Sequence, residues 1–312
     1  MSSLRRARTL ASAVVLSLAQ VTPAAALAAP GLTGASGSPS WACTPDSPAI
    51  TARGGIADSR GNVREKDTGQ VVSDMPKSAK GRAPASLTVS VPIYFHVITS
   101  GSTGDVTNAR LAAQVTQMNR AYSGGFGGPD TGFSFTLAGV DRTDNATWYA
   151  SKSGGAEHAM KQALKVGGDD VLNVYTTSGG AYLGWAYLPE ITDTAQAYLD
   201  GIVIDWRTVP GASDDYEGLY DEGDTLVHEA GHWLNLEHTF FGQCNKTGDF
   251  VADTPAEKSA AFGCQVGRDT CPAEGLDPVH NYMDYSDDPC LTEFTEGQAQ
   301  RMRDAWLLWR AS

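Results

Sequence analysis

Hydrophobic residues recur with two different periods between residues 87 and 221, and these periods predict strands and helices in mixed order. Runs of β-branched and aromatic residues, or of alternating polarity, are typical of strands. Such runs cover Leu87–Thr99, Phe133–Val140, Val171–Thr176, Ala181–Leu188 and Gly201–Val209. Apolar residues return at helical spacing over Asn108–Tyr122 and over Glu157–Val166, where two glycines follow. This order predicts an α/β sandwich in the N-terminal part of the folded region.

The pattern changes after the fifth predicted strand, where two helices flank a long stretch without periodicity. The first helix is predicted from about Glu222 to Leu234. The last helix begins at Thr295, because Gln298 follows three residues later as in a capping box, and it continues to Arg310. The Gly- and Cys-bearing stretch between the two helices is expected to be irregular.

The first 28 residues have the polarity of a secretory signal peptide. Three arginines precede an apolar run at Leu10–Leu18, and Ala26-Leu27-Ala28 offers the small residues of a cleavage site. We expect the cut after Ala28, so that residues 1–28 are removed on export. A membrane anchor is the alternative, although the apolar run is short for a bilayer span. A secreted, extracellular protein can keep disulfide bonds.

Composition divides the remaining chain into a basic leader and an acidic domain. Residues 29–87 are rich in Gly, Ser, Pro and Ala and carry seven basic and five acidic residues. Residues 88–312 carry 13 basic and 31 acidic residues, a net charge of −18 within a whole-chain total of −13. We interpret residues 29–87 as a pro-segment, with a plain linker as the alternative. The acidic balance argues against nucleic acid as a partner, because phosphate binding needs clustered Lys and Arg.

The segment from His228 to His238 carries the candidate chemistry. His228 and His232 are four residues apart, so a helix presents both imidazoles on one face, where they can bind one metal ion. Glu229 follows the first histidine and can reach a water molecule on that ion. His238 lies beyond the helix and becomes a third ligand only if the chain turns sharply. Asn235 stands at that turn, and asparagine tolerates a positive φ better than most residues.

Three histidine ligands predict a catalytic zinc ion rather than a structural one, because they leave the fourth tetrahedral position open. Zinc lowers the pKa of its bound water toward about 7. Glu229 would accept the proton as this water attacks a carbonyl, and would deliver it to the leaving amine. The alternative is an amphipathic helix with two surface histidines and no metal. The acids Asp221, Glu222 and Asp224 suit the positive N-terminal end of the helix.

The motif HExxHxxxxxH at His228–His238 resembles that of the metzincin metalloproteases. Asn281–Tyr285 is similar to the tight methionine turn of these enzymes. Further matches narrow the resemblance to the pappalysin family, especially its compact, ulilysin-like prokaryotic members. They are Trp233, the His-Thr-Phe at 238–240, the Asp-Thr-Pro at 253–255 and the run Met283–Asp288. The departure is Asn235, where metzincins usually carry glycine.

This resemblance implies an α+β metzincin fold for a catalytic domain at residues 88–312. The N-terminal subdomain, residues 88–238, would hold a mixed five-stranded sheet with helices and the active-site helix. The C-terminal subdomain, residues 239–312, would be irregular, with the methionine turn and a terminal helix. The implied activity is that of a zinc-dependent endopeptidase.

The resemblance also implies roles for three residues of the methionine turn. Met283 would form an apolar floor under the zinc site. Tyr285 would donate a hydrogen bond to the oxyanion of the transition state, and a packed core tyrosine is the alternative. Asp288 would lie at the base of the S1′ pocket and favour Arg or Lys after the scissile bond. A solvated loop acid is the alternative for Asp288.

Two further parts of the chain acquire expectations from the family. Gly184, Trp185 and Ala186 resemble the edge strand that pairs with an extended substrate. Asp249 and Asp253 would contribute to a structural calcium site, since carboxylate oxygens suit that ion. Two solvated loop acids are the alternative to the calcium site.

The sequence has five cysteines, of which four lie in the C-terminal part. These four allow three disulfide pairings, or a zinc site as the alternative. The family resemblance implies the pairs Cys244–Cys271 and Cys264–Cys290. Cys43 lies in the pro-segment, where its thiolate could take the fourth zinc position and keep the enzyme latent. An incidental or intermolecularly paired thiol is the alternative.

Together these features predict a secreted zinc endopeptidase made as a latent zymogen. We expect a monomer that acts on proteins or peptides, with no nucleic-acid partner and no membrane span after signal removal. Zinc is the expected catalytic cofactor and calcium a structural one. The alternatives are a cell-wall peptide hydrolase and a zinc-bearing binding module without turnover. The intact Glu229 argues against the binding module.

Overall fold

The computed structural model describes residues 68, 70–151 and 154–311. The predicted signal peptide, most of the predicted pro-segment and Cys43 lie outside the described residues. Within the described part of the chain, no helix combines the length and apolar character needed to cross a membrane.

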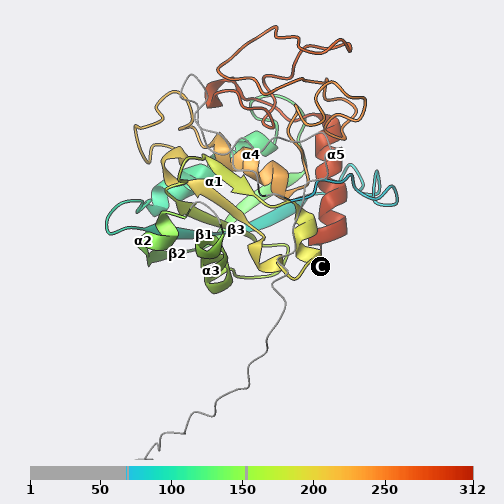
Figure 1. Cartoon of the computed structure of the whole chain (residues 1–312). Helices are drawn as coiled ribbons and strands as arrows, with labels where there is room; N and C mark the ends of the chain where they lie inside the picture. The colour runs from blue at the N-terminus through green and yellow to red at the C-terminus, as the bar shows by residue number, and fades with distance from the viewer. Residues whose placement is uncertain (1–67, 69, 152–153, 312) are drawn as a thin grey trace, which may run out of the picture. The chain divides into compact units, whose positions relative to one another are not determined.

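A mixed five-stranded sheet organises the N-terminal part of the described chain (Figure 1). Its strands are β1 (Val89–Thr99), β2 (Phe133–Asp144), β3 (Leu172–Thr177), β4 (Gly184–Ala186) and β5 (Ile202–Asp205). Their order is β2-β1-β3-β5-β4, and every neighbouring pair is parallel except β5 and β4. The antiparallel strand β4 therefore forms one edge of the sheet.

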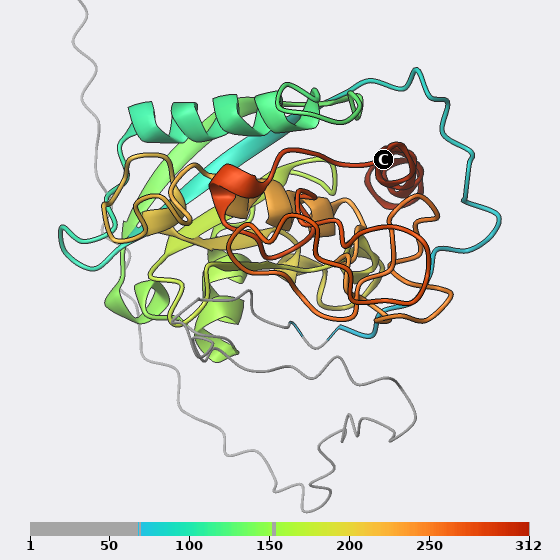
Figure 2. The ribbon, with the colours of Figure 1, turned by 90° about the horizontal axis from the view of Figure 1, so that it is seen from above.

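Helices cover both faces of this sheet. On one face, α1 (Asn108–Tyr122) and α4 (Asp224–Trp233) share the larger hydrophobic core with the sheet, and Figure 2 shows α1 lying along the strands. On the other face, α3 (Gly155–Leu164) and the 3₁₀ turns η1 (Pro189–Asp193) and η2 (Ala197–Leu199) enclose a smaller core. The alternation of β5 explains both cores, because Ile202 and Ile204 face the first and Val203 faces the second.

The C-terminal part is irregular up to its last helix, as predicted. Between α4 and α5 (Glu296–Ala305) the only helical turn among the described residues is η4 (Asp288–Cys290). The capping box that begins α5 is present, with Thr295 and Gln298 bonded to each other's backbone N–H groups. The chain then continues into a π-helical turn at Trp306–Arg310.

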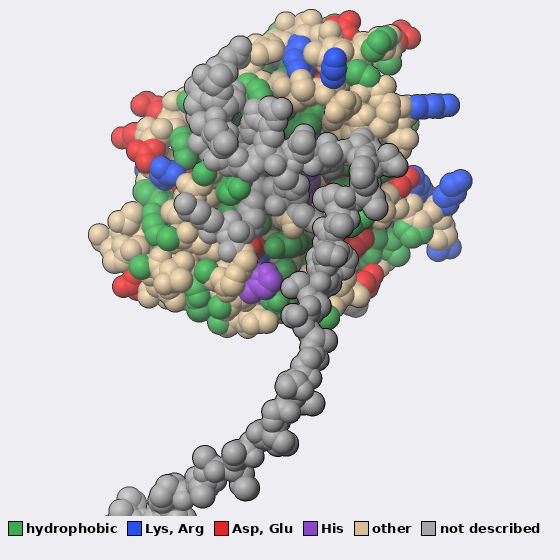
Figure 3. All heavy atoms as spheres, in the orientation of Figure 1, with side chains coloured by type: hydrophobic (Ala, Val, Ile, Leu, Met, Phe, Trp, Pro, Cys, Tyr) green, Lys and Arg blue, Asp and Glu red, His purple; other side chains and the backbone are tan. Residues whose placement is uncertain are grey.

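The face seen in Figure 3 carries acidic and basic side chains, mostly toward its edges.

Several element boundaries differ from the prediction for local reasons. α4 begins at Asp224 rather than at Glu222, because Gly223 has a φ of +95°, which is outside the helical region. β5 ends at Asp205, whose carboxylate accepts the N–H of Arg207 and starts the 3₁₀ turn Trp206–Thr208. β2 extends to Asp144 beside the full length of β1, and a short helix, α2 (Ala146–Tyr149), follows it.

Candidate active site

Helix α4 places two of the three predicted zinc ligands in the interior. All of its residues are buried, and His228, Glu229 and His232 are 7%, 1% and 5% exposed. The helix ends just before Asn235, which has a φ of +72°. The N–H of Leu236 then donates to the carbonyl of Gly231 at 2.9 Å, so the chain reverses. This left-handed turn is the one that asparagine was expected to supply.

The turn brings His238 back to the helix, and the three imidazoles converge. The Nε2 atom of His232 lies 3.2 Å from Nε2 of His228 and 3.2 Å from Nε2 of His238. Two ligands at roughly 2.0–2.1 Å from a tetrahedral zinc ion are separated by about 3.3 Å, so the spacing fits that ion. The donor set of three imidazole nitrogens also suits zinc.

Backbone carbonyls orient two of these rings. His228 Nδ1 donates to the Tyr282 carbonyl at 2.6 Å, and His232 Nδ1 donates to the Leu236 carbonyl at 2.7 Å. A proton on Nδ1 makes Nε2 the unprotonated nitrogen that can bind a metal, which is how such hydrogen bonds fix the tautomer of ligating histidines. The methionine turn, through Tyr282, thus holds the first ligand in place.

Met283 lies directly beneath the active-site helix and is fully buried. A Cβ atom built on Gly231 would overlap Met283 Sδ. Gly231 directly precedes His232 and had no predicted role, and its lack of a side chain lets the methionine approach. HExxH spacing alone carries no signal for this requirement, because Met283 is 52 positions away.

Tyr285 lies beside the histidine triad. Its ring centroid is 5.0 Å from that of His238 and 5.7 Å from that of His228. Phe240 packs against the same ring at 5.0 Å. Tyr285 also lines the pocket next to Glu229, so its position agrees with the role that the family resemblance implies.

A pocket opens beside the histidines and has an acidic interior. Asp288 is 3% exposed there and accepts the N–H groups of Glu222 and Asp224 at 2.9 and 3.3 Å. Burial, together with the charge of Asp224, raises the pKa of Asp288 well above its usual value. Burial also raises the pKa of Asp224 to about 7. The pocket is lined by Leu183, Tyr220, Asp224, Thr225, His228, Glu229, Asp284, Tyr285, Ser286, Asp288 and Leu291.

Three side-chain oxygens in this pocket lack hydrogen-bond partners among the described residues. They belong to Thr225 (Oγ1), Asp284 (Oδ2) and Ser286 (Oγ), all of which are buried. Asp284 uses its other oxygen to accept the N–H groups of Ala261 and Tyr285. None of these three residues was predicted to belong to the site. The period of two across Asp284, Ser286 and Asp288 is the signal that could have grouped them.

The predicted substrate strand lies at the sheet edge next to Glu229. A Cβ atom on Gly184 would be 2.8 Å from Glu229 Oε1, so this glycine backs directly onto the acid. Trp185 points the other way, and its Nε1 donates to buried Glu157 at 2.7 Å. Ala186 is buried toward the main core. Of the three predicted residues, Gly184 contacts the site, while Trp185 anchors the strand from the opposite face.

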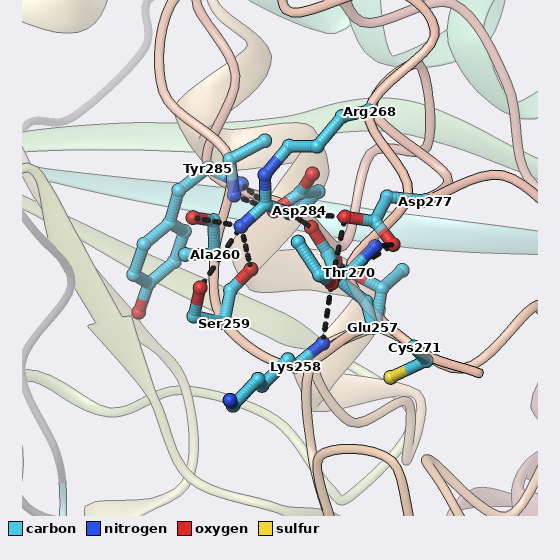
Figure 4. A network of polar contacts seen from close by, with 12 residues as sticks. Glu257, Lys258, Ser259, Ala260, Arg268, Thr270, Cys271, Asp277, Asp284 and Tyr285 are labelled. Atoms are coloured by element: carbon cyan, nitrogen blue, oxygen red, sulfur yellow. Dashed lines mark hydrogen bonds and ion pairs between the residues drawn. The ribbon is translucent and has the colours of Figure 1, made fainter.

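A buried polar network supports the turn after the third histidine (Figure 4). Thr239 donates to Glu257 at 2.9 Å, and Arg268 pairs with both Glu257 and Asp277, the latter at 2.6 Å. Burial and the nearby charge of Asp284 raise the pKa of Glu257 to about 8. The network therefore joins the chain next to His238 to the loop that follows Cys264.

The two predicted calcium ligands lie in different settings. Asp249 is 3% exposed, and its Oδ2 accepts no hydrogen bond within the described chain. It lines a second pocket formed largely by residues 245–256, and burial raises its pKa to about 7. The carboxylate of Asp253 instead accepts from Thr295 Oγ1 and from the Gly297 N–H, both at 2.8 Å. Asp249 fits a cation ligand, whereas Asp253 holds the start of α5.

The four C-terminal cysteines form two disulfides. Cys244 is bonded to Cys271 and Cys264 to Cys290, which is the pairing that the family resemblance implied. Both bonds staple the irregular stretch that carries the methionine turn. They exclude the alternative in which these four cysteines bind zinc.

Comparison with known proteins agrees with this geometry. The sequence model of the peptidase M43 family, described as pregnancy-associated plasma protein-A, matches residues 213–306. An extracellular metalloprotease from Colletotrichum graminicola is 45% identical over 239 residues, which cover 74% of this chain and 82% of that protein. An extracellular metalloprotease from Pyricularia oryzae is 44% identical over 247 residues, or 77% of this chain and 83% of that protein.

Solved structures show the same architecture. A promirolysin mutant from Tannerella forsythia matches 74% of this chain and 84% of its own, with 26% identity and a TM-score of 0.64. Mature mirolysin from the same organism, in complex with a cleaved peptide, matches 70% of this chain and 91% of its own, with 27% identity and a TM-score of 0.59.

Proposed function

Because the chain belongs to the pappalysin family of metzincin zinc metalloendopeptidases, we propose that it cleaves peptide bonds with Glu229 as general base. It is an extracellular zinc metalloprotease. The observation that carries the proposed mechanism is the convergence of three Nε2 atoms beside a buried glutamate. The histidines of this triad would hold the zinc ion.

Zinc, when bound, supplies Lewis acidity to the carbonyl and lowers the pKa of water. Glu229 accepts the proton of the attacking water and passes it to the leaving amine. Its burial in the pocket wall keeps the carboxylate in one place, since helix α4 carries it and Gly184 lies against it. Tyr285 donates a hydrogen bond to the oxyanion as it develops.

The substrate backbone pairs with the edge strand β4 and extends across the triad. β4 is the last strand of the sheet and pairs only with β5 among the described strands. Main-chain hydrogen bonds would then supply affinity without regard to sequence. We infer protein and peptide substrates in extended form, bound by a monomeric enzyme.

The acidic pocket selects Arg or Lys at P1′. Asp288 lies within it, and the buried oxygens of Asp284, Ser286 and Thr225 offer further acceptors. A buried oxygen without a partner costs about 1–3 kcal/mol, so a guanidinium that supplies N–H donors removes an existing penalty. The pocket sits beside His228 and Glu229, where the side chain after the scissile bond would enter.

Latency and calcium complete the proposal. A signal peptide at residues 1–28 directs export, and a following pro-segment presents Cys43 to the zinc ion until it is cut. Asp249 contributes to a structural calcium site with oxygens of the surrounding loop. Its unpartnered Oδ2 supports that assignment, because carboxylate and carbonyl oxygens are the ligands that calcium prefers.

Three variants test the mechanism, the selectivity and the latency. We expect Glu229→Ala to abolish cleavage of a peptide library while zinc content stays at the wild-type value. Unchanged turnover in that variant would reject the general-base role. We expect Asp288→Ala to reduce the preference for Arg over Leu at P1′. Cys43→Ala should yield a pro-enzyme that is active without processing, and a variant as latent as the wild type would reject the switch.

A further inference from the structure

The segment just before β1, residues 70–87, packs into the catalytic unit. Three of its apolar side chains are buried, with Met75 at 4%, Ala79 at 8% and Ala83 at 5% exposure, whereas Val71 is 83% exposed. In Figure 2 the segment passes along the side of the molecule where α5 stands. These residues fall within the stretch that composition assigned to the pro-segment, so their packing decides where such a segment can end.

Asp304 of α5 anchors this segment by accepting hydrogen bonds from its backbone. Its carboxylate accepts three consecutive backbone N–H groups, from Gly81 at 2.6 Å, Arg82 at 2.9 Å and Ala83 at 2.8 Å. Asp304 is 3% exposed. Release of the segment would break these three hydrogen bonds to a charged acceptor, which are stronger than bonds between neutral groups.

A second anchor lies at the other end of the segment. The Gln70 side chain donates to the Leu188 carbonyl at 3.0 Å and accepts the Leu188 N–H at 2.6 Å. The Gln70 amide thus bonds both backbone groups of Leu188, as a neighbouring strand would. Leu188 lies two residues after the end of β4. The segment therefore supports the end of the proposed substrate strand.

A third contact connects the segment to the zinc ligands. Asp74 pairs with Arg301 at 3.1 Å, and Arg301 Nε donates to the carbonyl of Asn235 at 2.7 Å. Asn235 is the left-handed residue that returns His238 to the site. The Arg301 side chain is only 4% exposed, so Asp74 is an anionic partner for a cation that is almost fully buried.

We propose that residues 70–87 are a permanent brace of the active enzyme, and that Asp74 positions the third histidine through Arg301 and Asn235. Any activating cut then falls before Gln70, rather than at the 87/88 boundary suggested by composition. The part concerning the cut rests on the proposed zymogen. The brace itself does not.

The N-terminus of the active enzyme tests the boundary. Full-length protein is expressed, allowed to mature, and analysed by N-terminal sequencing and intact mass. We expect an active species that begins at or before Gln70. An active species that begins after Gln70 would overturn the proposal. Full activity without any cut would reject the zymogen while leaving the brace supported, so the two failures are distinguishable.

Zinc affinity tests the positioning role in the full chain. We expect Asp74→Asn to weaken zinc binding about threefold and Arg301→Lys about 10-fold, measured by competition with a fluorescent chelator. Lys80→Gln is the matched control, because it removes the other partner of Asp74 and leaves the Arg301 pair intact. Wild-type zinc affinity in Asp74→Asn, with or without a lower melting temperature, would refute the positioning role.

Discussion

Replacement of Gly184 by alanine should damage catalysis without removing the zinc ion. The new Cβ would lie 2.8 Å from Glu229 Oε1 and 3.0 Å from the Val203 carbonyl oxygen, both closer than ordinary van der Waals contact. The carbonyl belongs to β5 and cannot retreat without breaking the sheet, so Glu229 must move by several tenths of an ångström. Glu229 is 1% exposed and has little room to do so.

The displacement can be converted into an expected rate. A misplacement of about 1 Å at a reacting group can cost about 100-fold in rate, so a shift of a few tenths predicts a loss of about 10-fold in kcat. KM should change less, because the strand backbone that would bind substrate stays paired with β5. Overpacking of this kind costs about 1–3 kcal/mol of stability.

The assay separates the rate from the fold. Steady-state kinetics on one peptide would be measured beside zinc content and melting temperature. Gly155→Ala is the matched control, because no described residue has an atom within 4 Å of a Cβ at that position and α3 accepts alanine there. A Gly184→Ala enzyme with wild-type kcat and full zinc content would refute the reasoning about Glu229.

Three other perturbations follow from the geometry. Gly231→Ala should lower the free energy of unfolding by about 1–3 kcal/mol, because the new methyl overlaps Met283 Sδ, and wild-type stability in urea titration would contradict that packing. The ratio of kcat/KM for Arg over Leu at P1′ should fall from about pH 8 to about pH 6, because burial raises the pKa of Asp224 to about 7 and the pKa of Asp288 well above its usual value, so the pocket loses negative charge as the pH falls; a flat ratio would contradict the acidic pocket. Calcium should raise the melting temperature of the wild type but not that of Asp249→Asn. Asp253→Asn should lower the melting temperature both with and without calcium, because Asp253 accepts hydrogen bonds at the start of α5. An equal calcium response in the wild type and in Asp249→Asn would show that Asp249 does not bind the ion.

Local spacing along the chain was sufficient to predict the zinc ligands and most of the helices and strands. His228 and His232 share a helix face because of the 3.6-residue period, and Asn235 tolerates the left-handed turn that follows. The capping box at Thr295 is likewise a contact between residues three apart. α1 has the predicted bounds, since its apolar spacing and its threonine cap agree. These features depend on residues that are close together in the sequence, so the sequence pattern predicts them directly.

The tertiary structure alone decided which distant residues meet. Gly231 must be small because of Met283, and Gly184 because of Glu229, contacts that no local pattern encodes. No local pattern indicates that the Asp253 carboxylate accepts hydrogen bonds from Thr295 and Gly297, more than 40 positions away. Residues 70–87 had the composition of a leader, but Asp304 accepts their N–H groups across more than 220 positions. The sequence by itself thus determined the chemistry of the site. Only long-range packing determined which glycines, carboxylates and flanking segments that chemistry requires.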